Sequence, residues 1–230
     1  MMAGFVHGVL NTDNMNITGE SFDYGPYRFL PHYDPSFTAA YFDNSGLYAY
    51  GRQPASVMWN LHQLGAALMV AYPNLSVEEL LEDFPDNFTL KVHQYLLKRL
   101  NLRNPLEDEA AAGKLNEELV MALFQFMSAS KSPFEQTLFD LHSGVNEGRL
   151  KRSPQSQFYQ GELFEKLKSD IDAFEILDEA KQAHPYFAQP KACSLLIDEL
   201  ESIWAPIAAQ DDWTLFETKL QEIRSIRNLY

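Results

Sequence analysis

Hydrophobic residues in the longer, C-terminal part of the chain recur at helical spacing. The first series follows Pro54 and stops at Tyr72-Pro73, where the proline disfavours a helical conformation of the residue before it. Its apolar members are Val57, Leu61, Leu64 and Leu68. Residues three or four positions apart lie on one face of a helix, so this pattern predicts a buried helix.

Further helix signals follow along the chain. Ser76 and Glu79 form a capping box, whose two side chains can satisfy backbone donors at the start of a short helix ending near Phe84. More helices are predicted, with boundaries good to about 2–4 residues. They cover residues 86–101, 115–129, 133–143, 156–168, 170–183, 191–204 and 211–227. The prolines after residue 100, Pro206 among them, mostly fall in the gaps.

The first 54 residues have a different texture. They are rich in aromatic residues, Gly, Pro, Asn and Asp, and their short apolar stretches are flanked by turn signals. This pattern predicts loops and small hairpins. The fold class is therefore mainly α with small β-hairpins (α+β). We expect two parts, with loops in residues 1–54 and helices in residues 55–230.

Composition and charge narrow the classes of function. The 230 residues are 46% hydrophobic, enough for a substantial core, and 32 acidic against 18 basic residues give a formal charge of −14. That charge argues against a nucleic-acid partner. The single cysteine, Cys193, excludes an intramolecular disulfide. The N-terminal sequence resembles neither a signal peptide nor a membrane span, so we expect a soluble, cytoplasmic protein with no membrane partner.

The candidate chemistry lies in residues 7–26, HGVLNTDNMNITGESFDYGP. A phosphoryl-transfer site of the protein-kinase type has a His, a basic Asp two residues later, a metal-binding Asn five residues after that Asp, and then Asp-Phe-Gly. Here His7 begins the loop, Asn14 falls at the metal-binding position, and Asp23 heads Asp-Tyr-Gly. Val9 stands where the base belongs, so two metal ligands match and the base is missing.

The two candidate ligands can be brought together by a hairpin. Residues 15–18 and 21–24 could form short strands around Gly19-Glu20, which would place Asn14 near Asp23. An amide oxygen and a carboxylate suit Mg²⁺, whose shell a nucleotide would complete. Asp13 is then a candidate base, although it could equally face away and cap a turn. Ordinary polar turns would also explain the whole stretch.

Several spaced blocks of sequence carry a family resemblance. They are HGVLNTDNM, DYGP, YDPSF at 33–37, YGRQP at 50–54 and WNL at 59–61, with SIWAPIAAQDDWTLFETKL at 202–220 as a looser match. In their order and spacing they resemble the SelO (YdiU) family. These are kinase-fold proteins that transfer AMP from ATP to Ser, Thr or Tyr hydroxyls of proteins, with ATP bound in an inverted orientation.

The resemblance implies a role for each candidate residue. Asp13 matches the proposed proton acceptor, Asn14 and Asp23 match the ligands of Mg²⁺ or Mn²⁺, and Asp23 also lies near the nucleotide phosphates. The implied partners are ATP and protein substrates. Members of the family also carry an upstream small lobe with a Gly-rich loop and a phosphate-pairing Lys, which cannot be placed here.

We therefore expect the chain to be the large-lobe portion of a kinase-like fold with an added helical C-terminal region. The missing N-terminal lobe would be supplied in cis or in trans, and the chain alone would be inactive. The alternative is a non-catalytic helical remnant, or a partner-binding module that complements a separate small lobe.

Other features have two interpretations each. Tyr33-Asp34-Pro35 and Arg52 would contact a peptide substrate or, as we favour, provide packing and a capped turn. Asn60 could fix the loop above it through a backbone hydrogen bond. Trp204 and Trp213, on either side of an interhelical corner at residues 205–207, are expected in the core, although exposed tryptophans would form a partner surface.

Overall fold

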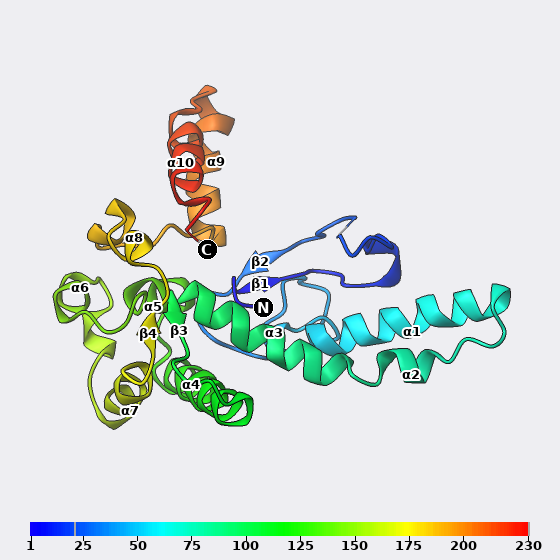
Figure 1. Ribbon diagram of the computed structural model, residues 1–230. Helices are drawn as coiled ribbons and strands as arrows, with labels where there is room; N and C mark the ends of the chain where they lie inside the picture. The colour runs from blue at the N-terminus through cyan, green and yellow to red at the C-terminus, as the bar shows by residue number, and fades with distance from the viewer. Residues whose placement is uncertain (21, 230) are drawn as a thin grey trace. The chain divides into compact units, whose positions relative to one another are not determined.

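The computed structural model describes residues 1–20 and 22–229. These residues are mostly helical, with two small antiparallel sheets of two strands each (Figure 1). The predicted α+β class is therefore confirmed. The chain divides into two compact units: the first holds most of residues 1–92, and the second holds residues 31–33 and His93 onward.

The first unit contains one small sheet, two short 3-10 helices and two complete α-helices. In the sheet Phe5 pairs with Phe29 and Val6 with Arg28. The elements are β1 (Phe5–Val6), η1 (Thr12–Asn14), β2 (Arg28–Phe29), η2 (Tyr50–Arg52), α1 (Gln53–Ala71) and α2 (Val77–Leu81). Loops therefore give way to helices at Gln53, near the boundary between residues 54 and 55 that the sequence predicts. That this boundary separates two domains stays a prediction. Helix α3 (Phe84–Arg99) begins in this unit and ends in the other.

The second unit is built from helices and one further sheet, in which Leu102 pairs with Ile176 and Arg103 with Glu175. Its elements are β3 (Leu102–Arg103), α4 (Glu109–Ser130), α5 (Phe134–Asp140), α6 (Glu147–Arg152), η3 (Ser156–Phe158), α7 (Glu162–Ile171), β4 (Glu175–Ile176), α8 (Glu179–Gln182), η4 (Pro185–Ala188), α9 (Ile197–Gln210) and α10 (Thr214–Ile226).

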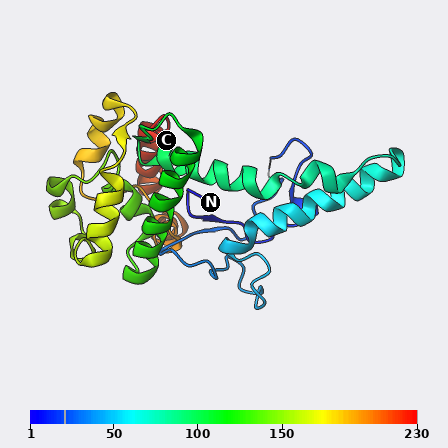
Figure 2. The same cartoon turned by 60° about the horizontal axis from the view of Figure 1, so that its bottom comes forward.

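The core of the second unit lies where α4 packs against α7, side by side in both ribbon views (Figures 1 and 2). Phe126 on α4 and Phe164 on α7 are buried, with ring centroids 5.7 Å apart. A second cluster surrounds Phe139 at the end of α5. It consists of Tyr186, Phe187, Ala192, Cys193 and Leu229, with Ile223 and Ile226 packed against it.

A buried arginine holds the end of α5. The Arg149 guanidinium donates hydrogen bonds to the carbonyl oxygens of Phe139, Asp140 and His142, at 3.3, 3.4 and 2.6 Å. The last carbonyls of a helix have no partner within the helix, so this side chain satisfies groups that would otherwise be buried unpaired. The Asp140 carboxylate accepts hydrogen bonds from the side chains of Ser153 and Tyr159. Polar contacts as well as apolar packing therefore shape this unit.

The differences between predicted and observed helices have local causes. Helix α4 begins earlier than expected because the Asp108 carboxylate accepts a hydrogen bond from Ala111 N–H (2.8 Å). The helix predicted over residues 170–183 is wrong. Helix α7 ends at Ile171 and strand β4 follows, after which Asp178 caps a separate short helix, α8.

The helix predicted over residues 191–204 begins late, at Ile197. Ala192 N–H donates to Gln136 Oε1 and Cys193 N–H donates to Tyr186 Oη, each at 2.9 Å. Because side chains of other elements engage these donors, the segment around Cys193 is not helical.

Helix α1 has the predicted extent, but the prediction that it is buried is wrong. Only Gln53, Asn60 and Gly65 of this helix are buried, and Val70 is 86% exposed. Part of its surface packs on α2, where a Cβ at Gly65 would lie only 2.5 Å from Val77 Cγ1. The predicted cap at Ser76 is confirmed by the hydrogen bond from Glu79 N–H to Ser76 Oγ (3.4 Å). Of the predicted stripe, Val57 and Leu61 are only partly buried, and Leu64 and Leu68 are exposed.

The expectations for the C-terminal helices also need correction. Pro206 lies inside α9, and the corner is at Asp211, whose φ of 56° is left-handed and whose N–H donates to Ile207 O (2.9 Å). Trp204 is 61% exposed and Trp213 45% exposed, so neither is a core residue. Smaller residues, Ile207 and Leu229, are the buried side chains of this region instead.

None of the described helices combines the length and apolar character that crossing a membrane requires.

Candidate functional site

The His7 side chain connects the two halves of the candidate motif. His7 is buried, its Nδ1 accepts a hydrogen bond from Val9 N–H (3.0 Å), and its Nε2 lies 2.6 Å from the Asp23 carbonyl oxygen. A carbonyl can only accept, so Nε2 carries the proton and the ring is neutral. Burial lowers the pKa of His7 and outweighs Asp23, which favours the charged ring. The loop at residues 7–9 is thereby tied to Asp23.

Two residues of α1 form hydrogen bonds that hold this loop in place. Gln53 Oε1 accepts from His7 N–H (2.9 Å), and Gln53 Nε2 donates to Phe5 O (3.0 Å). Asn60 Nδ2 donates to Leu10 O (3.2 Å), which confirms the hydrogen bond expected from the sequence. The first turns of a long helix therefore position the loop that carries the candidate residues.

A close approach of backbones adds to these hydrogen bonds. A Cβ placed on Gly8 would lie 2.3 Å from Pro26 Cδ, which is far inside van der Waals contact. Gly8 N–H also points to Tyr24 O, at 3.4 Å. The residues on either side of the motif therefore fit together only with glycine at position 8.

The expected pairing around Gly19 is present as backbone hydrogen bonds. Phe22 N–H donates to Asn14 O and Asn16 N–H donates to Glu20 O, both at 2.8 Å. Gly19, with φ of 84°, makes the turn. The two segments are not regular strands, and Ser21 lies outside the described residues. Since Phe22 pairs with Asn14, the next residue, Asp23, is brought into the neighbourhood of Asn14, as the sequence predicted.

The side chains of Asn14 and Asp23 are each oriented by the backbone. Asn14 Nδ2 donates to Val9 O (2.8 Å), so its Oδ1 is the atom that it would offer to a cation. Asp23 Oδ1 accepts from Gly25 N–H (2.8 Å) within the Asp-Tyr-Gly turn. Val9, which replaces the base of ordinary kinases, thus contributes backbone groups to both His7 and Asn14.

Asp13 lies in the short helix η1 and its side chain is exposed. The residue that caps this helix is Asn11, whose Oδ1 accepts from Thr12 N–H (2.9 Å). Burial raises the pKa of Tyr48, and the negative charges of Asp43 and Asp13 raise it further. The charge of Asp13 therefore acts on the segment around Tyr48. The cap of this helix is therefore Asn11, two residues before Asp13, and the role of Asp13 as a base stays a prediction.

The segment from Asp34 to Arg52 is held by capped turns and packing. Asp34 Oδ1 accepts from Ser36 N–H (2.9 Å), and Gly51 N–H donates to Pro35 O (2.9 Å). A Cβ at Gly51 would lie 2.9 Å from Pro35 Cβ, so the two motifs are in close contact. In the second unit, Tyr33 stacks on Phe124 with ring centroids 4.6 Å apart. These contacts agree with the favoured interpretation, which is packing and a capped turn. Contact of Arg52 with a peptide substrate stays the alternative interpretation.

The ligand types fit magnesium better than zinc. Among residues 1–20 and 22–229 there is no group of three or more His, Cys, Asp or Glu side chains placed to hold a metal ion. Asn14 and Asp23 instead offer one amide oxygen and one carboxylate. Mg²⁺ in nucleotide sites characteristically takes one or two protein oxygens, with phosphate oxygens and water as its other ligands. The pair is therefore chemically suited to Mg²⁺ bound together with a nucleotide.

Sequence reasoning missed the supporting roles of His7 and Gln53. In the sequence, His7 was noted as the first residue of the motif and Gln53 as part of the YGRQP block, and neither was given a role. A signal was available, because a buried histidine in a polar loop needs partners for both ring nitrogens. The ring nitrogens bond to Val9 N–H and to the Asp23 carbonyl, whereas Gln53 bonds to the His7 backbone N–H and is distant in the sequence.

Comparison with known proteins shows the family to which the chain belongs. The model of the family described as "Protein adenylyltransferase SelO" matches residues 1–224. The chain belongs to the SelO family. A protein nucleotidyltransferase YdiU of Trichodesmium erythraeum is 35% identical over 97% of this chain, and that of Synechocystis sp. is 35% identical over 98%.

A human member of the SelO family is also similar over a shorter stretch. The mitochondrial protein adenylyltransferase SelO of Homo sapiens is 39% identical over 61% of this chain and 20% of its own length. The two bacterial relatives are covered to 47% and 48% of their lengths. The chain thus spans about half the length of the curated YdiU relatives that it matches.

Proposed function

We propose that this chain carries the metal-binding and proton-accepting part of a Mg²⁺-dependent protein adenylyltransferase that uses ATP. The observation that carries the proposal is the set of hydrogen bonds that links Asn14 through Val9 to His7, and His7 to Asp23, within a segment that matches the SelO family. The names of the relatives, nucleotidyltransferase and adenylyltransferase, support the reaction class.

Each candidate residue has a definite task in this reaction. Asn14 Oδ1 and the Asp23 carboxylate would hold Mg²⁺ or Mn²⁺, which supplies positive charge against the nucleotide phosphates. Asp13 would accept the proton of a Ser, Thr or Tyr hydroxyl on a target protein. The hydroxyl oxygen forms a bond to the α-phosphorus of ATP as the bond to pyrophosphate breaks. The exposure of Asp13 is consistent with a base that must meet the side chain of another protein.

We further propose that the chain forms the large-lobe part of a kinase-like fold and needs more polypeptide for activity. It spans about half the length of its YdiU relatives, and positioning of the nucleotide supplies most of the rate in phosphoryl-type transfer. A small lobe, provided in cis or in trans, would supply the remaining phosphate contacts. The isolated chain is then expected to be inactive.

A hollow in the first unit favours such complementation. It has a volume of about 420 Å³ and lies between residues 12–19 and α1. Its apolar lining includes Met15, Ile17, Trp59 and Leu64, and Trp59 is about half exposed. Large exposed apolar surfaces usually receive another chain or segment. This observation also supports the second candidate function, a non-catalytic module that binds a separate small lobe.

The test is transfer of labelled AMP from α-labelled ATP to a mixture of proteins. We expect no incorporation by the chain alone, and incorporation when the part of the Trichodesmium relative that this chain does not match is co-expressed with it. Replacing Asp23 by Ala should abolish that signal, and Asp13→Asn should reduce it strongly. Formation of a stable complex without any AMP transfer would favour the non-catalytic module. Activity that survives Asp23→Ala would contradict the assignment of the site.

A further inference from the structure

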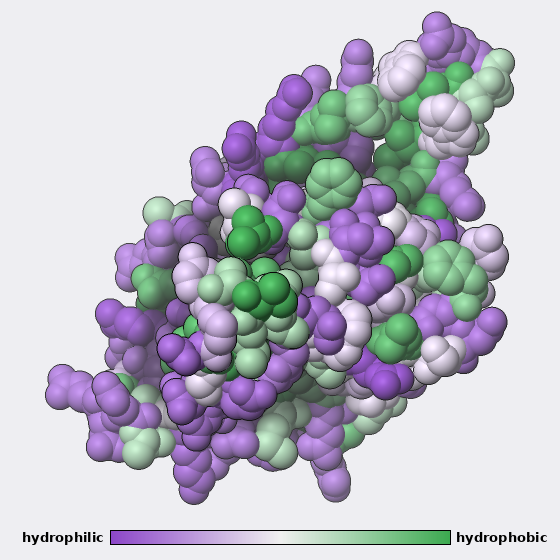
Figure 3. All heavy atoms as spheres, turned by 90° about the vertical axis from the view of Figure 1, so that its right-hand side faces the viewer, coloured by the Kyte–Doolittle hydropathy of each residue, from purple (hydrophilic) through white to green (hydrophobic). Residues whose placement is uncertain are grey.

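The helices α9 and α10 form an antiparallel hairpin that exposes several large apolar side chains. We define the hairpin tip as residues 200–218, which comprise α9 from Leu200 onward, the turn and the first part of α10. Four large apolar side chains of the tip are exposed: Trp204, Trp213, Leu215 and Phe216. Figure 3 shows pale and green, hydrophobic side chains gathered on this hairpin among purple ones. Such a concentration of tryptophan at a surface is typical of binding hot spots.

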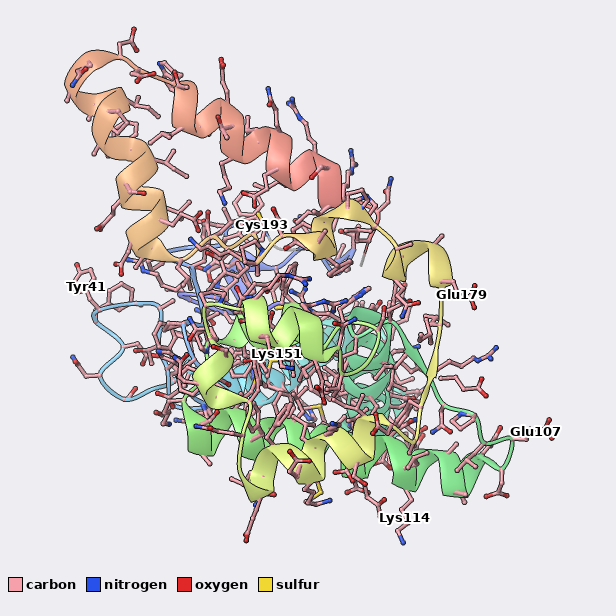
Figure 4. All side chains as sticks on the ribbon, turned by 90° about the vertical axis from the view of Figure 1, so that its left-hand side faces the viewer. Tyr41, Glu107, Lys114, Lys151, Glu179 and Cys193 are labelled. Atoms are coloured by element: carbon pink, nitrogen blue, oxygen red, sulfur yellow. The ribbon has the colours of Figure 1, made fainter. Side chains whose placement is uncertain are left out.

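The base of the hairpin is firmly anchored, in contrast to the tip. Ile223, Ile226 and Leu229 pack on the cluster around Phe139. Lys219 Nζ lies 2.7 Å from Glu199 Oε1 and 2.6 Å from Glu222 Oε2, which joins α10 to α9. Although burial opposes it, the hydrogen bonds to these carboxylates raise the pKa of Lys219, so it stays charged. Figure 4 shows the labelled Cys193 at this base. The tip is therefore presented by a fixed support.

Two aromatic side chains of the tip, Trp213 and Phe216, are held in place before any partner binds. The Trp213 indole Nε1 donates to Asp211 Oδ1 (2.8 Å), and the ring meets Phe216 edge-on with centroids 5.5 Å apart. Trp204 lies near the middle of α9, before the turn at Asp211, and its side chain is exposed. Side chains that are already ordered lose little conformational entropy on binding.

The charge of the tip indicates what kind of partner it fits. Residues 200–218 contain four acidic residues, Glu201, Asp211, Asp212 and Glu217, and no Lys or Arg. A second copy of the same surface would bring like charges together, and an anionic membrane would also be repelled. A cationic segment would instead gain from the carboxylates and from contact of its Arg or Lys with the tryptophan faces.

We propose that the hairpin tip docks a segment of another protein that combines Arg or Lys with apolar side chains. The apolar side chains would cover Trp204, Trp213 and Phe216, while the cationic groups would face the surrounding acids. This interaction surface belongs to the second unit and does not depend on the chemistry proposed for residues 7–25.

The test uses the full chain and a fluorescent 14-residue amphipathic peptide of arginine and leucine, with binding followed by anisotropy. We expect saturable binding that weakens with added salt, and no binding of a matched peptide with Glu in place of each Arg. Trp204→Ala should weaken binding at least tenfold. That residue is exposed within a helix, and alanine favours helices, so the variant should fold. Tyr41→Ala, which removes another exposed aromatic, should leave binding unchanged.

A second variant separates charge from apolar contact. Asp211→Asn with Asp212→Asn keeps side chains that can cap the turn but removes two charges, so binding should weaken several-fold and depend less on salt. The control Glu107→Gln with Glu109→Gln removes two exposed acids elsewhere and should have little effect. Equal binding by the Trp204→Ala and Tyr41→Ala proteins would overturn the proposal. So would sedimentation showing that the chain dimerises and that Trp204→Ala abolishes the dimer.

Discussion

The loop at residues 7–25 of the first unit and the α4–α7 pair of the second are held in place by different forces. In the loop, single side chains such as His7 and Asn14 bond to backbone groups. In the helix pair, large apolar residues such as Phe126 and Phe164 are buried against each other. Packing contributes stability in proportion to buried area, whereas hydrogen bonds contribute less but fix direction. The candidate site thus depends on the direction of its hydrogen bonds. The second unit depends on how well buried side chains fill its core.

The largest expected effect comes from opening a cavity between α4 and α7. Phe126→Ala should lower the free energy of unfolding by about 3–5 kcal/mol, because it removes a buried ring and leaves a void. Met121→Ala, an exposed position on the same helix, should change it by less than about 1 kcal/mol. Denaturant unfolding followed by circular dichroism measures both. Similar losses for the two variants would contradict the packing described for α4.

A smaller effect is expected when the hydrogen-bonded support of the loop is removed. Gln53→Ala leaves the His7 N–H and the Phe5 carbonyl without this partner, at a cost of about 1–3 kcal/mol. The loss should appear as faster amide hydrogen exchange at His7 and in the loop, with α4 unaffected. Gln63→Ala, an exposed glutamine of the same helix, is the matched control. Unchanged exchange at His7 in the Gln53 variant would show that the support lies elsewhere.

The smallest effect concerns pH and the His7 ring. Burial lowers the pKa of His7 in the folded loop, where Nδ1 accepts from Val9 N–H. Between that lowered pKa and the ordinary value of about 6.5, the folded loop binds fewer protons than a loop in which this hydrogen bond is broken. Stability of the loop is therefore complete above about pH 6.5 and falls as the pH drops through the folded-state pKa. Protonation of Nδ1 removes the acceptor of Val9 N–H, a loss of about 1 kcal/mol.

The protection factor of the Val9 amide, measured by hydrogen exchange between pH 7 and pH 4, follows this opening. It should decrease with pH, while that of the Leu123 amide in α4 serves as the reference. Direct titration of the imidazole by NMR gives the sign independently. A titration midpoint above 6.5 would contradict the neutral, buried ring.

The same contrast explains what the sequence could and could not predict. Periodicity placed α1 and the capping box gave α2, since both depend on residues a few positions apart. The burial of α1 was wrong, because burial depends on what lies opposite a face and not on the face itself. The helix predicted over residues 211–227 is confirmed by α10, but the helix predicted over 170–183 failed because Asp178 caps a separate short helix, and α9 continues past the expected corner to Asp211.

In the candidate site, local spacing was enough to predict that Asn14 and Asp23 approach each other. A hydrogen bond from Asn60 to the backbone of the loop was also predicted, although its partner, Leu10 O, was not named. The links from His7 to Gln53 and Asp23 were not predicted, because they join segments whose meeting depends on the whole unit. Motif spacing therefore identified the chemical groups, and tertiary contacts identified what orients them.

The close fit of Gly8 against Pro26 has a practical consequence for protein engineering. Chimeras between this chain and its relatives are a direct way to test the proposed need for more polypeptide. A crossover placed between these two positions could pair a bulkier residue from one parent with the proline of the other, and the loop would then be forced open. Junctions should therefore fall outside residues 7–26, so that the stretch is inherited from one parent as a single block.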